Sequence, residues 1–471
     1  MSQTVSEPCA TPAMTSVPKP VSQPITSAPD FEASTVAGLP QWWRVGQQEA
    51  WNRFAALPLP KRKDESWRFT DTTKLTDILE GPVAGLPLSD AARREVKELL
   101  LARAAKSKSV AGLAFANDEQ VFFRALPGSL LSQGVLFLPF AEALKTHSDL
   151  VEKYFMTHAT TLGGAKFEAL HRAFCRAGAF LYIPKGVEIS APIEVHHWIG
   201  ESGAAIFPHT LVIAEANSRA EIVVHYGSLS AAKGGLSVSA VDLHAGPGAK
   251  VRSIAVQNFE ETVHSFQTGS TAVERDGSAL SFALNLGSTY ARVENKSRML
   301  GAGSRSDMLS LTAATGSQVF DQRTYQEHVA DHTTSDLLYK NALADTSKTI
   351  FAGMIAVDPG AQQTDAYQSN PNLLLSDTAE ANSLPGLQIE ANDVRCTHGS
   401  TGGPIRGEEV FYMAQRGIPL SVARRLFVLG FFDEVLHRLG DPALSEELHE
   451  LIEIKYDRAA KTASAAANAS N

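Results

Sequence analysis

The sequence predicts an all-β core, a β-helix-type solenoid over residues 176–395, flanked by an N-terminal and a C-terminal helical domain. Three observations lead to this fold class. A pattern recurs about every 29 residues through the middle of the chain, the segments inside each interval are short and strand-like, and helical periodicity is confined to the two flanks. Stacked β coils between helical domains account for all three.

The repeat places an apolar residue two positions after a small or polar one, following a turn-like cluster. The apolar positions are Ile193, Ile222, Val251, Leu280, Met308, Leu337 and Ala366, which are 29, 29, 29, 28, 29 and 29 residues apart. A fixed period of this length is typical of a solenoid, in which each repeat is one structural unit.

The segments within each interval alternate apolar and polar residues, as in "EIVVHYGSL" and "LSVSAVDLHA", and Gly, Asn, Asp and Pro separate them. At about 3.3 Å per residue, one fully extended interval would span roughly 95 Å. Each interval must therefore contain several strands with corners. Neighbouring coils can then bury together an inward face that one coil could not bury alone.

The flanks of the solenoid differ from it in composition. Residues 1–40 are rich in Ser, Thr, Pro and Ala and are expected to be a disordered extension. Residues 41–175 read as a mainly helical N-terminal domain, in which Ser89 is a good N-cap. Residues 396–456 predict a C-terminal helical domain, and residues 457–471 a disordered tail.

The C-terminal helical domain carries more apolar residues than one capping face requires. They wrap more than one helix face, so part of this surface is expected to bind a partner, although capping of the solenoid could use all of it. The residues are Phe411, Tyr412, Val422, Leu426, Phe427, Leu429, Phe431, Phe432, Val435 and Leu436.

Composition excludes several classes of function. The formal charge of −9 is spread along 471 residues, which argues against nucleic acid or an anionic membrane as the main partner. Three cysteines are too few for a disulfide framework, so we expect a reducing, cytoplasmic compartment. No Gly-Lys dipeptide occurs, so the chain has no P-loop and is not expected to hydrolyse ATP itself.

Cys396 and His398 in "QIEANDVRCTHGSTGG" are the candidate metal ligands. If this segment is a strand, Val394, Cys396 and His398 lie on one face, because side chains alternate with period two. Two ligands complete neither a tetrahedral zinc site nor an iron-sulfur cluster. A buried cysteine beside a hydrogen-bonded histidine is the alternative. Cys175 in "HRAFCRAGAF" is expected to be a core residue, and Cys9 to have no role.

Five segments together resemble the SufB/SufD family of iron-sulfur cluster assembly scaffolds. They are "ESWRFTD", "FLYIPKGVEISAPIEV", "IFAGMIAVDPGAQQTDAYQSNPNLLLS", "ANDVRCTHGSTGG" and "VFYMAQRGI", and the resemblance runs from about Trp42 to Tyr456. The Cys-x-His-Gly pattern at 396–399 is most similar to the SufD branch.

The resemblance implies a right-handed parallel β-helix core between helical domains. It also implies a non-catalytic scaffold subunit of a SufBCD-type complex, a heterodimer with a SufB-like paralogue, and a SufC-type ATPase docked on the C-terminal helices. Cys396 and His398 would then lie at the heterodimer interface and bind iron or a nascent iron-sulfur cluster shared with the partner. His398 is the stronger candidate ligand, and no tightly bound cofactor is expected in the isolated chain.

Two other functions remain open from the residues alone. A β-helix carbohydrate-active enzyme would need a surface groove with Asp, Glu, Lys or Arg clustered on successive coils, but the acidic residues fall mostly at predicted corners and no stacked acidic pair is evident in the sequence. A purely structural adaptor would use the Cys-His pair only for packing. If the C-terminal helices dock the ATPase, removal of the chain after about Arg406 is expected to abolish docking and leave the solenoid folded.

Overall fold

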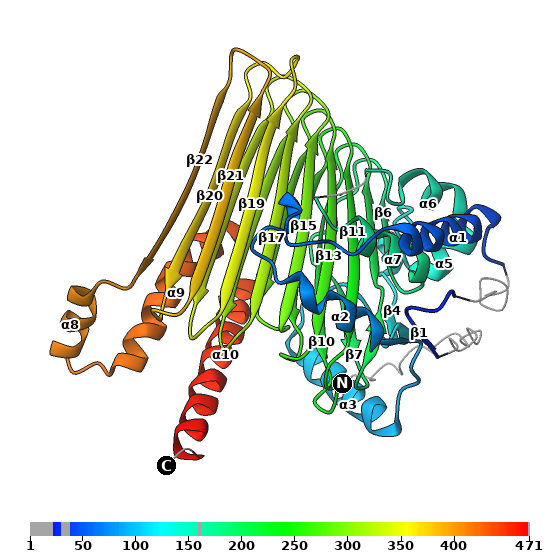
Figure 1. Ribbon diagram of the computed structural model, residues 1–471. Coiled ribbons are helices and arrows are strands. Elements are labelled where there is room, and N and C mark those ends of the chain that lie inside the picture. Colours follow the sequence, from blue (N-terminus) through cyan, green and yellow to red (C-terminus); the bar gives the residue numbers. More distant parts are fainter. Residues whose placement is uncertain (1–21, 30–37, 159–161, 470–471) are drawn as a thin grey trace, which may run out of the picture.

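The centre of the molecule is a stack of β coils whose walls are two long sheets, sheet A and sheet B (Figure 1). The computed structural model describes residues 22–29, 38–158 and 162–469. The strands of sheet A are β1 (Gln23–Pro24), β2 (Val83–Ala84), β5 (Leu136–Pro139), β6 (Gly178–Ile183), β8 (Ala204–Ile206), β9 (His209–Ala214), β11 (Leu236–Ala245), β13 (His264–Val273), β15 (Tyr290–Met299), β17 (Val319–His328), β19 (Lys348–Val357) and β21 (Glu380–Ile389). Those of sheet B are β3 (Ala111–Ala116), β4 (Glu119–Arg124), β7 (Ile193–Ile199), β10 (Arg219–Ser228), β12 (Lys250–Asn258), β14 (Ser278–Asn285), β16 (Arg305–Ala314), β18 (Thr334–Leu343), β20 (Asp365–Leu374) and β22 (Arg395–Pro404).

The chain alternates between the two sheets, so each coil adds one strand to each wall. Sheet A runs in the order β2-β8-β11-β13-β15-β17-β19-β21, and sheet B in the order β22-β20-β18-β16-β14-β12-β10-β7-β3-β4. Pairing between successive coils is parallel throughout. The predicted fold class, a parallel β-helix with helices at both ends of the chain, is confirmed.

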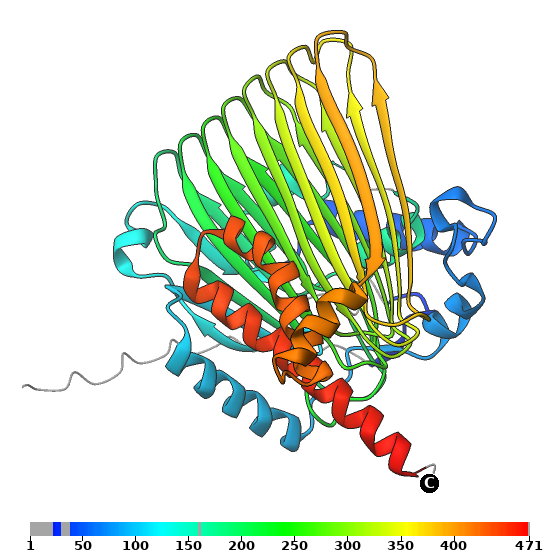
Figure 2. The same ribbon diagram turned by 90° about the vertical axis from the view of Figure 1, so that its left-hand side faces the viewer.

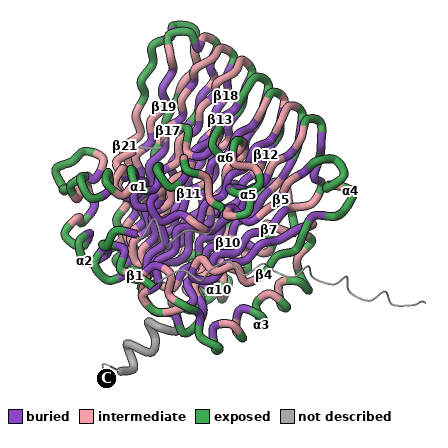
Figure 3. The backbone as a smooth tube through the Cα atoms, turned by 90° about the vertical axis from the view of Figure 1, so that its right-hand side faces the viewer, coloured by how far each residue is buried: buried purple, intermediate pink, exposed green. Residues whose placement is uncertain are grey.

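The seven repeat positions lie in seven successive strands of sheet B, as the repeat predicted. They do not all pair with one another, however, because the number of residues between paired positions varies from coil to coil. Paired residues are separated by 27 positions between Ala279 and Ser306 and by 31 between Ser335 and Ala366. Leu280 therefore occupies the outer face, and its neighbour Ala279 faces inward. Corner loops absorb such insertions because they lie at the surface, where most of the exposed residues in Figure 3 are found.

The interior of the solenoid changes from apolar to polar along its length. The first coils enclose aliphatic side chains such as Val195, Val212 and Ile222. In later coils the buried Asn341 amide donates to Asn372 Oδ1 at 2.8 Å and accepts from Gln322 at 3.2 Å. Polar side chains satisfied by one another can line the interior at little cost in stability.

The N-terminal region covers one end and the outer face of sheet A. Its α-helices are α1 (Gln41–Ala56), α2 (Leu75–Glu80), α3 (Asp90–Lys106), α4 (Gly128–Leu131), α5 (Phe140–Thr146), α6 (Ser148–Tyr154) and α7 (Ala165–Phe174). Ser89 caps α3 by accepting the Ala92 amide hydrogen. Strands β3 and β4 of this region belong to sheet B, and β5 belongs to sheet A. The N-terminal region is therefore continuous with the solenoid, and residue 176 marks no break between domains.

Part of the predicted disordered extension is ordered. Gln23–Pro24 pairs with β2, and Ile25 beside it is fully buried. An apolar residue can anchor a short stretch of chain even within a segment rich in Ser and Pro. Residues 1–21 and 30–37, including Cys9, lie outside the described residues.

The C-terminal region departs from its predicted bounds at both ends. Residues 396–404 belong to β22, and the helices are α8 (Gly407–Gln415), α9 (Leu420–Leu439) and α10 (Pro442–Ala469). Residues 457–469 are therefore helical where a disordered tail was predicted, in keeping with the high helix propensity of alanine. Within the described residues, no helix is both long and apolar enough to cross a membrane.

Helices α9 and α10 pack on the outer face of sheet B (Figure 2). Val428, Phe432 and Leu436 of α9 share an apolar cluster with Leu309 and Leu311 of β16. Removal of the chain after Arg406 would expose this apolar cluster. That the truncated solenoid stays folded remains a prediction, and this contact is the cost that it has to overcome. The contacts come from the sheet's outer face, which the sequence pattern did not assign to these helices.

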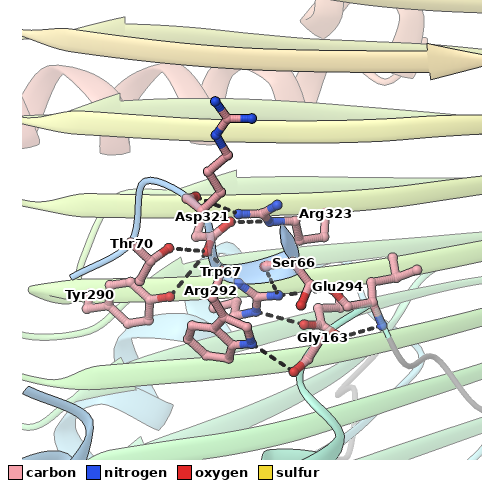
Figure 4. A network of polar contacts seen from close by, with 11 residues as sticks. Ser66, Trp67, Thr70, Gly163, Tyr290, Arg292, Glu294, Asp321 and Arg323 are labelled. Carbon is pink, nitrogen blue, oxygen red and sulfur yellow. Dashed lines mark hydrogen bonds and ion pairs between the residues drawn. The ribbon is translucent and has the colours of Figure 1, made fainter. Parts of the chain in front are cut away.

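A buried charge network fastens the "ESWRFTD" segment to the outer face of sheet A (Figure 4). The Arg292 guanidinium pairs with Glu294 at 2.7 Å and Asp321 at 2.5 Å, and it lies 4.0 Å from the Trp67 ring centroid. Thr70 also donates to Asp321. Trp67 is thus an anchor of the N-terminal region rather than an exposed binding residue.

Candidate functional site

The solenoid ends at β21 and β22, which are the last strands of their sheets. Each pairs with a single neighbour, β21 with β19 and β22 with β20. Figures 1 and 2 show these two strands as the outermost of the stack, at the end opposite to the N-terminal helices. Their unpaired backbone groups are available to further strands or to a partner.

The inward face of this last coil is exposed, unlike that of the coil before it. Gln368 and Asn370 in β20 are fully buried, whereas His398 and Ser400, which pair with them in register, are exposed. In β21, Leu387 is 37% exposed although it faces inward. A surface built as the interior of a solenoid is therefore open at this end.

Cys396 and His398 lie on that exposed inward face, as the alternation of strand residues predicted. Cys396 pairs with Ala366 and packs against Ile355 and Val357, and it is half-buried. Burial raises the pKa of the Cys396 thiol, and the carboxylate of Asp365 adds to the effect. The thiol is therefore neutral at physiological pH unless a cation binds it.

His398 is held less tightly than its neighbour. Its side chain is exposed, and within the described part of the chain no hydrogen bond or ion pair fixes the imidazole. No described residue thus occupies either imidazole nitrogen, and both can bind a metal or a partner group. The alternative prediction, a buried cysteine beside a hydrogen-bonded histidine, does not match this exposed ring.

The described residues provide no third ligand next to this pair. Cys396 and His398 belong to no group of three or more His, Cys, Asp or Glu side chains whose ligand atoms could hold one ion. Zinc needs four ligands and iron-sulfur clusters usually use four cysteines. The arrangement can bind iron or a cluster only together with donors from outside the described residues.

Gln368 is a polar residue of this end that the sequence did not single out. Its side chain lies directly beneath the His398 position in the next coil, and neither amide atom has a hydrogen-bond partner among the described residues. A Cβ added to Gly353 would meet the Gln368 amide oxygen at 2.5 Å, so this glycine makes room for it. Only the register of β20 against β22 reveals this neighbour.

An acidic pair is stacked on successive coils, contrary to the sequence expectation. Asp307 of β16 and Asp336 of β18 are partners in register on the outer face of sheet B. Arg305 lies 2.8 Å from Asp307, and Arg438 of α9 lies 2.8 Å from Asp336. Because both carboxylates are neutralised and α9 covers Asp336, this pair offers no groove for a carbohydrate substrate.

Comparison with known proteins gives the same family as the five segments that resemble SufB and SufD. Residues 197–431 match the family model described as SUF system FeS cluster assembly, SufBD core domain, and residues 103–195 match the SufBD protein N-terminal region. The chain belongs to the SufBD family. This family is one of iron-sulfur cluster assembly proteins.

Relatives of this SufBD-family chain cover most of its length. The iron-sulfur cluster assembly protein SufD of Bacillus subtilis is 29% identical over 424 residues, 88% of this chain and 94% of the relative. SufBD family proteins of Synechocystis and Pyrococcus horikoshii are 27% and 25% identical, covering 86% and 84% of this chain and 89% of each relative. The similarity to SufD is confirmed.

Proposed function

We propose that this SufBD-family chain is a non-catalytic scaffold subunit of a SufBCD-type complex that assembles iron-sulfur clusters. It pairs with a SufB-like paralogue and docks a SufC-type ATPase. The observation that carries this proposal is the exposed inward face of the last coil, which presents Cys396 and His398 without a third ligand among the described residues.

The open end of the solenoid is the surface proposed for the paralogue. Strand edges β21 and β22 can pair with strands of a second β-helix, and Leu387 and Ile389 offer apolar surface at 37% and 40% exposure. A second β-helix placed against this end would bury Leu387 and Ile389, just as each coil within the solenoid buries the inward residues of the coil before it. The Gln368 amide, which has no hydrogen-bond partner among the described residues, would also be enclosed near the interface.

Iron or a nascent cluster is the cargo that we assign to this interface, not a resident cofactor. Cys396 and His398 supply two donors, and the paralogue supplies the rest. Binding of a cation favours the Cys396 thiolate and displaces its proton, so assembly at this end releases protons. The exposed His398 side chain has no hydrogen-bond or ion-pair partner in the part of the chain that the structure describes, so it can turn toward the cargo without breaking such a contact there.

Helix α8 is the proposed docking element for the ATPase. None of its residues is buried, and Figure 1 shows it projecting from the rest of the molecule. Phe411 and Tyr412 on α8 are 63% and 56% exposed, and Leu420 and Val422 continue the apolar surface onto α9. Exposed apolar residues grouped in this way mark a protein-binding surface.

We place the complex in the cytoplasm, with neither nucleic acid nor membrane as a partner.

Coexpression with a SufB-like paralogue and a SufC-type ATPase tests the proposed function. We expect one complex that hydrolyses ATP and that absorbs in the visible range after anaerobic loading with iron and sulfide. The full-length chain alone is expected to hydrolyse no ATP, because it has no P-loop. A complex that forms but never retains iron would favour a structural adaptor, and ATP turnover by the purified single chain would contradict a non-catalytic role.

The docking role of α8 gives a second, separate prediction. Phe411→Glu is expected to weaken ATPase binding at least tenfold, because the charge replaces an exposed aromatic anchor. Leu101→Glu on α3 is the matched control, since Leu101 is also 63% exposed but lies outside α8 and α9. Titration calorimetry of each variant heterodimer with the ATPase measures the change. Equal affinity of both variants would remove α8 from the docking site.

A further inference from the structure

Three potential metal ligands meet in the core, far along the sequence from Cys396. His171 lies on α7, Cys175 directly follows this helix, and His209 begins β9 of sheet A. All three side chains are fully buried, and each offers one ligand atom within 4.8 Å of the others. They lie between the helical layer and the outer face of sheet A, where α7 packs on β11.

The two imidazoles are oriented from outside, as in metal sites. His171 Nδ1 is 2.8 Å from the Val238 carbonyl oxygen, which can only accept, so this nitrogen carries the proton. His171 Nε2 therefore presents its lone pair to His209 Nδ1 at 3.1 Å. On the far side of its ring, His209 Nε2 is 3.4 Å from Asp242 Oδ2. A carbonyl or carboxylate behind a histidine is the usual support of a metal-binding imidazole.

The charges in this pocket balance when a divalent ion is added. Asp242 is the acidic residue beside the cluster: its Oδ2 accepts the Met156 backbone N–H at 2.6 Å and lies 3.4 Å from His209 Nε2. One divalent cation, the Cys175 thiolate and the Asp242 carboxylate sum to zero charge.

We propose that His171, Cys175 and His209 bind one divalent transition-metal ion of the zinc class, with Asp242 as the residue that orients His209. Two nitrogens and one sulfur suit zinc or ferrous iron, and three protein ligands leave one tetrahedral position open. The site lies within this chain alone and does not depend on the proposed complex. Its role is to tie α7 to strand β9.

The surroundings of the site make binding part of folding. The rings of Phe140 and Phe155 lie 5.0 and 4.6 Å from the His209 ring and cover it with apolar surface. Since no ligand is exposed, the ion is expected to enter before α7 closes over the sheet and to exchange slowly afterwards. Metal added to the folded chain is therefore a poor test of the site.

The experiment uses the full-length chain expressed in minimal medium with Co²⁺ in place of Zn²⁺. A Cys9→Ser/Cys396→Ser double variant leaves Cys175 as the single thiol of the chain. We expect it to retain about one cobalt per chain after dialysis, with the sulfur-to-cobalt charge-transfer band and the visible bands of tetrahedral Co²⁺. This readout needs no change within the cluster, so it does not depend on whether a ligand variant folds.

Ligand variants then assign the donors. Each is added to the double variant. Cys175→Ser is expected to abolish the charge-transfer band and to lower cobalt retention at least tenfold, and His209→Gln is expected to lower cobalt retention by a similar factor. A folded double variant that holds no cobalt would overturn the proposal and identify the cluster as a hydrogen-bonded histidine pair beside a core thiol. Full cobalt retention, with unchanged tetrahedral visible bands, when Cys175→Ser is added to the double variant would overturn it as well.

Discussion

Replacement of Arg292 by methionine is expected to lower the free energy of unfolding by about 3–5 kcal/mol, the usual cost of removing one partner from a buried ion pair. Arg292 is fully buried between Glu294 and Asp321. Methionine keeps much of the side-chain volume, so the loss reflects charge rather than a cavity. The Trp67 ring also loses the cation that lies against it.

Urea unfolding followed by circular dichroism measures this change, and Arg305→Met is the matched control. The Arg305 side chain is 49% exposed and pairs with Asp307 at 2.8 Å, so its loss is expected to cost at most about 1 kcal/mol. Equal midpoints for the two variants would show that the network of Figure 4 adds nothing beyond a surface ion pair.

The same variant should change the response to acid. Burial by itself raises the pKa of Asp321, but Arg292 and Arg323 together hold it below its usual value in the folded chain. A carboxyl with a lowered folded pKa stabilises the fold above its unfolded pKa, near 4, and this contribution is lost as pH falls through the folded pKa. The stability difference between wild type and Arg292→Met should therefore narrow below about pH 4.

His398→Ala is expected to reduce iron retention by the heterodimer about tenfold or more and to leave the heterodimer intact. One lost ligand weakens a site with few ligands far more than it weakens a large protein interface. Cys396→Ala should have a similar or smaller effect, because Cys396 also packs against Ile355 and Val357. Iron per heterodimer and melting temperature are measured on the same preparations.

Thr397→Ala is the control for position on the strand. Thr397 lies between the two candidate ligands but faces outward, so its loss is expected to change neither iron content nor stability. Normal iron loading in His398→Ala, with or without a lower melting temperature, would remove His398 from the cargo site.

Much of the architecture follows from local patterns. The repeat near 29 residues predicted one β coil of several strands per interval, and alternation along 394–398 placed Cys396 and His398 on one face. Chain termini were harder, because the alanine-rich end of α10 has the small side chains of a disordered segment and also a high helix propensity. Composition alone does not separate these outcomes.

The register of neighbouring strands could not be predicted from the sequence. Coils of different length put Leu280 on the outer face and stacked Asp307 on Asp336, although the repeat pattern suggested neither. The corner loops decide which residues pair, and they tolerate insertions with little change in sequence pattern. Gln368 became a neighbour of the His398 position for the same reason.

The sequence by itself determined the β-helix, its helical flanks and the two candidate ligands of its last coil, because these depend on periodicity within short segments. Only the tertiary structure decided that this coil is open, and that His209 meets His171 and Cys175. The spacing of four residues between His171 on α7 and Cys175 directly after it is visible in the sequence, but His209 lies 34 residues beyond Cys175 on a strand. Contacts of that kind arise from how α7 packs on sheet A, and no local pattern encodes them.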